Sequence, residues 1–152
     1  MEDRLVSEYI GKDADKFMEG KINWLAAILG QAIGPVWFFF RKSYLLGFAF
    51  IILTLIVGRV ATSLGIKKAY YIMFLIYLFL ANKLYLWDVR RKVKKILENN
   101  ENMSQEQLVE IARKKGGTNA VAAAIYVISI VALFVILYAM LFSAMQSSAL
   151  WY

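Results

Sequence analysis

The sequence contains few residue types that carry out covalent chemistry. It has no cysteine and no histidine, which excludes thiol and histidine-assisted nucleophiles, disulfides and the usual zinc sites. Close pairs of carboxylates occur at Asp13/Asp15 and Glu106/Glu110, both on faces that we expect to be exposed to water. We therefore predict no enzyme activity, no catalytic residues, no cofactor and no metal site.

Basic residues remain as candidates for a binding function. One short stretch contains Arg90, Arg91, Lys92, Lys94 and Lys95, and an earlier aromatic run ends in Arg41 and Lys42. Such clusters attract acidic lipid headgroups, acidic protein partners or RNA. No RNA-binding motif and no interleaved aromatic residues accompany the longer stretch, so we expect no nucleic acid. Orientation and anchoring in a membrane is the simplest interpretation of both clusters.

The composition indicates that these residues belong to a membrane protein. The chain is 61% hydrophobic and only 19% charged, with a mean hydropathy of +0.55, whereas soluble domains average about half apolar and a quarter charged. Long uncharged apolar runs are typical of membrane spans. They predict an all-α, polytopic helical membrane protein with spanning helices over residues 44–61, 69–87 and 119–145.

Residues 22–40 form a fourth apolar element that is interrupted. Gly30 and Gly34 loosen the helix, and Pro35 removes a backbone donor and clashes with the preceding turn. Gln31 is the polar side chain inside this element, and Trp37 suits the headgroup zone of a bilayer. Two alternatives stay open, a re-entrant helical hairpin or a kinked fourth span.

The remaining segments lie outside the spans. Residues 1–21 are amphipathic, because two helical turns place their apolar residues on one face; these are Leu5, Val6, Tyr9 and Ile10, followed by Ala14, Phe17 and Met18. Residues 88–118 extend the helix that begins at residue 69 as far as residue 98 and then turn back. Ser104 and Gln107 have the spacing of a capping box, which completes a short helical hairpin. Residues 146–152 form a tail that ends in Trp151 and Tyr152, an interfacial pair.

The first third of the chain resembles the DUF2628 family of small bacterial membrane proteins. The matching positions are Tyr9, Gly11, Lys12, Ala14, Asn23, Trp24, Ala26, Gly34, Pro35, Trp37, Arg41, Lys42 and Tyr44, with a weaker echo in residues 114–119. The spacing between Asn23-Trp24 and Gly34-Pro35 is about one helical turn longer than in the family pattern. The resemblance implies a membrane location and brings no activity with it.

The charge distribution predicts the orientation in a cell membrane. By the positive-inside rule, residues 88–118 are cytoplasmic, which places the C-terminus outside. Lys67 and Lys68 then face outward, in mild conflict with the rule.

Two functions are compatible with these predictions. In the first, the protein is a non-enzymatic interaction, regulatory or scaffold subunit, and its basic segment contacts anionic lipids, a protein partner or a second copy. In the second, it is a small oligomeric transporter or channel-like protein built around the broken helix at Gly34-Pro35, since interrupted helices border many binding sites.

Overall fold

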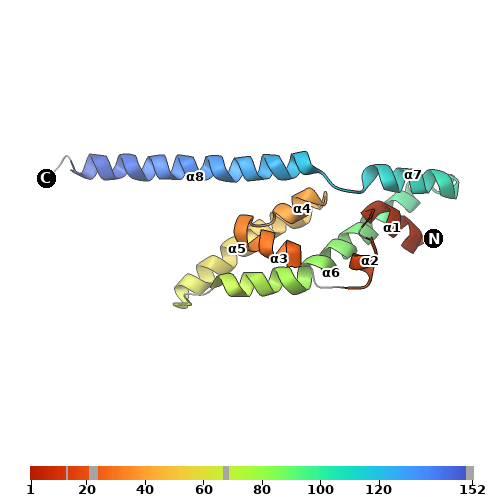
Figure 1. The fold of residues 1–152 in the computed structure, drawn as a ribbon, viewed down its shortest axis with the longest axis horizontal. Coiled ribbons are helices and arrows are strands. Elements are labelled where there is room, and N and C mark those ends of the chain that lie inside the picture. The colour runs from red at the N-terminus through yellow and green to blue at the C-terminus, as the bar shows by residue number, and fades with distance from the viewer. Residues whose placement is uncertain (13, 21–23, 67–68, 150–152) are drawn as a thin grey trace.

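A computed structural model describes residues 1–12, 14–20, 24–66 and 69–149. Every regular element in these ranges is a helix (Figure 1). The helices are α1 (Glu2–Ile10), α2 (Ala14–Met18), α3 (Trp24–Ile33), α4 (Val36–Phe40), α5 (Tyr44–Ser63), α6 (Ala69–Glu98), α7 (Gln105–Lys115) and α8 (Ala120–Ala149). Predictions that concern Asn23, Lys67-Lys68 and Trp151-Tyr152 lie outside the described residues.

Three of these helices, α5, α6 and α8, are long and apolar enough to cross a membrane. This confirms the all-α class and is compatible with a multi-pass membrane protein. Helix α6 runs without interruption through residues 69–98, as the continuous apolar spacing predicts, because no glycine or proline occurs within it. Its first half is apolar and its second half is charged.

Helices α3 and α4 are separated at the predicted break. Gly34 has a φ of 73°, a left-handed conformation that disfavours side chains, and Pro35 precedes the first residue of α4. Phe17, upstream of α3, lies 5.9 Å from the Trp37 ring in α4. The chain therefore turns back between α3 and α4, so that α4 returns to the residues that precede α3.

Helices α1, α2, α7 and the second half of α6 gather at one end of the molecule, opposite the C-terminus (Figure 1). We call residues 1–20 and 88–118 the helical module. Helix α1 packs against both α6 and α7, and its four predicted apolar residues are all buried. Met18 is 39% exposed, so the prediction that it joins this face is wrong; α2 has only five residues, and Ala14 and Phe17 provide its buried side.

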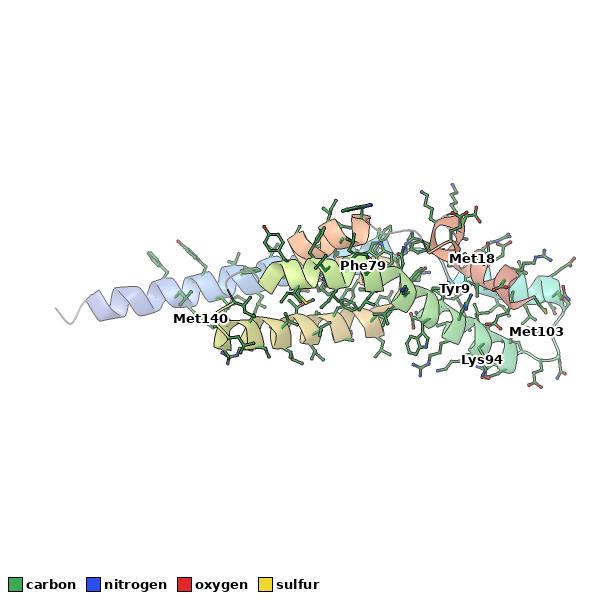
Figure 2. All side chains as sticks on the ribbon, turned by 90° about the horizontal axis from the view of Figure 1, so that it is seen from below. Tyr9, Met18, Phe79, Lys94, Met103 and Met140 are labelled. Carbon is green, nitrogen blue, oxygen red and sulfur yellow. The ribbon has the colours of Figure 1, made fainter. Side chains whose placement is uncertain are left out.

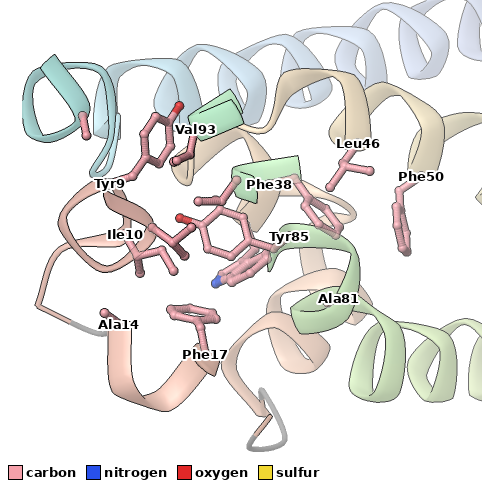
Figure 3. Close-up of a cluster of buried hydrophobic side chains, with 14 of the residues drawn as sticks. Tyr9, Ile10, Ala14, Phe17, Phe38, Leu46, Phe50, Ala81, Tyr85 and Val93 are labelled. Atoms are coloured by element: carbon pink, nitrogen blue, oxygen red, sulfur yellow. The ribbon is translucent and has the colours of Figure 1, made fainter. Parts of the chain in front are cut away.

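An aromatic cluster joins the module to the apolar helices (Figure 3). Trp37 is 2% exposed and packs edge-on against Phe38 and Tyr85, with ring centroids 5.2 Å and 5.3 Å away. Trp37 is therefore a core residue of the chain. Phe38 continues the cluster to Phe50 at 4.7 Å.

Helix α8 contacts the rest of the chain near its beginning. The Tyr126 ring stacks on Phe39 with centroids 4.6 Å apart, and the apolar stretch beyond it projects past α5 and α6 (Figures 1 and 2). Ala124 and Ala132 in this helix are exposed. Such an apolar surface requires a nonaqueous environment or another helix around it.

Candidate functional site

A buried carboxylate fixes α5 to α6 at the point where α6 changes from apolar to charged. Asp88 is 5% exposed and accepts hydrogen bonds from Ser43 Oγ at 2.6 Å and Lys92 Nζ at 2.5 Å. Lys92 Nζ also donates to the Lys42 carbonyl oxygen at 2.9 Å. These two donors compensate the burial of the carboxylate, so this group holds the second half of α6 at a fixed position relative to α5.

Arg41 and Lys42 are both directed into the protein. Arg41 is 8% exposed, and its guanidinium lies 4.9 Å from the centroid of the Phe17 ring. Lys42 has a φ of 56°, and its Nζ donates to the Gly116 carbonyl oxygen at 2.6 Å. An ammonium at this position compensates the carbonyl groups exposed at the end of α7. Both residues therefore join segments of the chain, and we do not include them in a lipid-binding surface.

The segment after α7 is tied to the first third of the chain by backbone contacts. Gly117 N donates to the Tyr9 carbonyl oxygen at 2.8 Å, and Asn119 N donates to the Phe40 carbonyl oxygen at 2.6 Å. The Asn119 side chain donates to the Tyr44 hydroxyl at 2.9 Å. This packing gives a physical reason for glycine at residue 116, where a Cβ would lie only 2.0 Å from the Tyr9 carbonyl oxygen.

The basic residues of the α6 cluster differ in the partners that they contact. Arg90 approaches Asp3 at 3.9 Å, and Lys94 approaches Glu98 at 3.9 Å. The Arg91 guanidinium lies 5.7 Å from the Trp87 ring centroid. Three of the cluster's side chains thus have a partner within the chain, whereas Lys92 and Lys95 line a pocket beside α1 and α7.

Lys92 and Lys95 line an open pocket of about 320 Å³ in the helical module. The pocket lies between α1, α6 and α7, and its lining residues are Tyr9, Lys92, Lys95, Ile96, Asn99 and Lys115. Figure 3 shows the Tyr9 ring beside Val93, with its hydroxyl directed away from the aromatic cluster. Burial, and secondarily the charge of Asp88, raises the pKa of Tyr9 to about 12, so the hydroxyl keeps its proton near neutral pH.

Four lining residues of the pocket, Tyr9, Ile96, Asn99 and Lys115, were not identified as site residues from the sequence. The available signals were the helical face that contains Tyr9 and the basic end of the segment before Gly116. Neither signal indicates that residues 9 and 115 meet, because that contact depends on how α1 and α7 pack.

The broken-helix element is filled by aromatic side chains where the structure describes it. A Cβ at Gly34 would lie 2.9 Å from the Tyr126 hydroxyl oxygen. Gly30 and Gln31 lie in α3, but the Gln31 side chain is outside the described part. The described residues contain no group of three or more side chains suited to hold a metal ion.

Comparison with known proteins adds one finding. A family model described as "Protein of unknown function (DUF2628)" matches residues 6–91. This range includes α1 from Val6 onward, α2 to α5, and α6 through Arg91. The segment after α7 that packs on Tyr9 and Phe40 lies beyond it. No curated protein and no solved structure matches the chain.

Proposed function

Because the chain belongs to the DUF2628 family, whose description assigns no activity, we propose its function from its geometry. We propose that it is a non-enzymatic membrane interaction protein that holds the helical module against the anionic surface of a bilayer. The observation that carries this proposal is the continuity of α6, which joins an apolar span to a charged extension in one helix.

The continuity of α6 sets the depth of its basic residues. Trp87 is 54% exposed and suits the interface. At 1.5 Å per residue, Arg91 then lies about 6 Å and Lys95 about 12 Å farther along the axis. The headgroup region extends about 5–8 Å beyond the hydrocarbon on each side. Helical side chains also tilt toward the N-terminus, which for α6 means back toward the bilayer.

We infer a topology of three spans and one re-entrant hairpin formed by α3 and α4. This proposal is supported by the return of α4 toward Phe17 and by the packing of α1 on α7. Both favour an N-terminus on the same side as residues 88–118. We assign that side to the cytoplasm from the positive-inside rule.

The natural absence of cysteine permits a direct test of this topology. Single variants Lys12→Cys, Met103→Cys and Leu64→Cys are labelled in sealed vesicles with a membrane-impermeant reagent. We expect residues 12 and 103 to react from one side and residue 64 from the other. Reaction of residue 12 from the side of residue 64 would make α3 and α4 a full span.

Lipid enrichment tests the proposed function itself. The protein is reconstituted in nanodiscs with mixed phosphatidylcholine and phosphatidylglycerol, and its lipid shell is quantified by mass spectrometry. Arg91→Glu with Lys94→Glu should reduce enrichment of the anionic lipid about fivefold or more, given about 1 kcal/mol per basic residue near an anionic surface. Arg59→Glu is the matched control, because it makes the same change of charge at the far end of α5, on the other side of the membrane in the proposed topology. An unchanged lipid shell, together with binding of an acidic soluble protein, would replace the lipid proposal by a protein-docking role.

The alternative of an oligomeric transporter receives less support from the packing. Phe39 and Tyr126 occupy the space beside the Gly34-Pro35 break, where a transport site would need a polar lining. A stable oligomer in nanodiscs, with substrate-dependent protection of this break, would favour that function.

A further inference from the structure

The two segments of the helical module have opposite net charges. Residues 1–20 have a net charge of −3 and residues 88–118 a net charge of +3. Some of the opposing charges meet in ion pairs, with Arg113 Nη2 at 2.9 Å from Glu8 and Arg90 at 3.9 Å from Asp3. The module is therefore not a uniformly basic surface.

The pocket between α1, α6 and α7 retains uncompensated positive charge. Lys92 is paired with Asp88. Lys95 and Lys115 form no ion pair with any residue that the structure describes, and no carboxylate lines the pocket. Two lysines next to each other in the same depression repel one another, so the site favours an anion that contacts both.

The other lining groups provide the hydrogen-bond donors that an oxyanion requires. Tyr9 is 5% exposed, and no hydrogen bond within the described chain engages its hydroxyl. The raised pKa of Tyr9 keeps this group a donor. The Asn99 amide also lines the pocket and contributes two further donor hydrogens.

We propose that this pocket binds one phosphate monoester, carried by the headgroup of an anionic phospholipid. A phosphate monoester carries a charge of about −1.5 to −2 at neutral pH, which matches the two unpaired lysines better than the single charge of a diester does. Its terminal oxygens are acceptors for the ammonium and hydroxyl groups.

The lipid is favoured as the source by the position of the pocket. Lys92 and Lys95 lie one to two turns beyond Trp87 on α6, and their side chains lean toward the bilayer. This assignment rests on the proposed function, because it requires that the module lie at the membrane surface.

Stoichiometric lipid binding tests the pocket. The full chain is prepared in detergent and in nanodiscs, and binding of phosphatidic acid, phosphatidylglycerol and phosphatidylcholine is measured by native mass spectrometry. We expect one tightly bound phosphatidic acid per chain, weakened about tenfold by Lys95→Ala or Lys115→Ala and more by both together. Lys12→Ala and Lys114→Ala are the matched controls, because they remove the same charge from exposed positions of the helical module outside the pocket, and should leave this binding within about twofold.

Conservative variants separate binding from folding. Tyr9→Phe keeps the ring in place and should weaken the bound lipid about threefold or more through the lost donor. Lys95→Arg and Lys115→Arg should restore binding of the monoester if charge is what the pocket supplies. An equal loss of phosphatidic acid binding in the alanine variants and in their controls would overturn the assignment of this binding to the pocket.

The lipid panel and a soluble competitor identify the ligand. Equal binding of phosphatidic acid and phosphatidylglycerol at the site would overturn the monoester assignment. Displacement of the lipid by glycerol 3-phosphate at equal concentration would overturn the lipid as the source and leave a site for a soluble phosphate monoester. Displacement by an acidic peptide and not by phosphate would identify a protein-docking site instead.

The proposed function can fail independently of this inference. General enrichment of anionic lipid depends on Arg91 and Lys94 in the preceding experiment, whereas one-to-one binding depends on Lys95 and Lys115. Loss of the first with the second retained would contradict surface anchoring and keep the pocket.

Discussion

Replacing Gly116 by alanine tests the contact that fastens α1 to the remainder of the helical module. A Cβ at residue 116 would lie 2.0 Å from the Tyr9 carbonyl oxygen and 2.7 Å from the Tyr9 Cα. Nonbonded carbon atoms prefer a separation of about 3.5–4.0 Å, so the backbone at Tyr9 has to retreat by roughly 1 Å or more. The hydrogen bond from Gly117 N to Tyr9, now 2.8 Å long, would then be lost.

The free-energy cost follows from these two changes. Overpacking of a well-packed contact costs about 1–3 kcal/mol, and loss of a backbone hydrogen bond costs about 1 kcal/mol. The sum of about 2–4 kcal/mol corresponds to a roughly 30- to 1,000-fold increase in the population with α1 detached.

Hydrogen–deuterium exchange of the α1 amides in nanodiscs measures that population. Gly116→Ala should accelerate exchange in α1 by the factor above and leave the middle of α5 unchanged. Gly58→Ala provides the control, because nothing lies within 4 Å of a Cβ at that position. Exchange of α1 in Gly116→Ala within about threefold of the natural chain would refute the steric argument.

Three further perturbations probe other contacts. Gly34→Ala should destabilise the folded chain in thermal unfolding, because the added Cβ would lie 2.9 Å from the Tyr126 hydroxyl oxygen. Adding Tyr126→Phe should recover part of the lost stability. If the double variant shows no recovery, backbone strain at residue 34 is the cause. Asp88→Ala should lower the free energy of unfolding by about 1–3 kcal/mol, since it removes the acceptor of the buried Ser43 hydroxyl and the ion-pair partner of the partly buried Lys92. Glu98→Ala, in an exposed pair, should change it by less than about 0.5 kcal/mol. The pKa of Tyr9 is raised from its ordinary value of 10.0 to about 12 in the folded chain, so the free energy of unfolding should fall as the pH rises from about 10 to 12. In thermal unfolding between pH 9 and 12, Tyr9→Phe should make this fall shallower. An identical pH profile in the variant would contradict the burial of Tyr9.

Local structure was largely predictable, because each element depends on neighbours in the sequence. The uninterrupted spacing after residue 69 predicts α6 to its last residue, Glu98. Ser104 and Gln107 form the expected capping box, with the Ser104 amide donating to Gln107 Oε1 at 2.9 Å. Gly34 and Pro35 divide α3 from α4 where their backbone preferences require it.

The candidate site was only partly predictable. The sequence identified Lys92 and Lys95 as members of a basic cluster, but charge along a chain does not say which members are neutralised. Ion pairs with Asp3 and Glu98 involve two others of the cluster, and these pairings depend on the packing of α1 and on side-chain reach.

What the sequence by itself determined is the set of helices, their apolar faces and which of them are apolar enough to cross a membrane, because hydropathy and backbone preference act within a few residues. The tertiary structure alone decided that Trp37 and Arg41 are buried and that Tyr9 and Lys115 share a pocket. The physical reason is that these features arise from packing between segments far apart in the chain, where backbone contacts such as that between Gly117 and Tyr9 select one arrangement among many with the same helices.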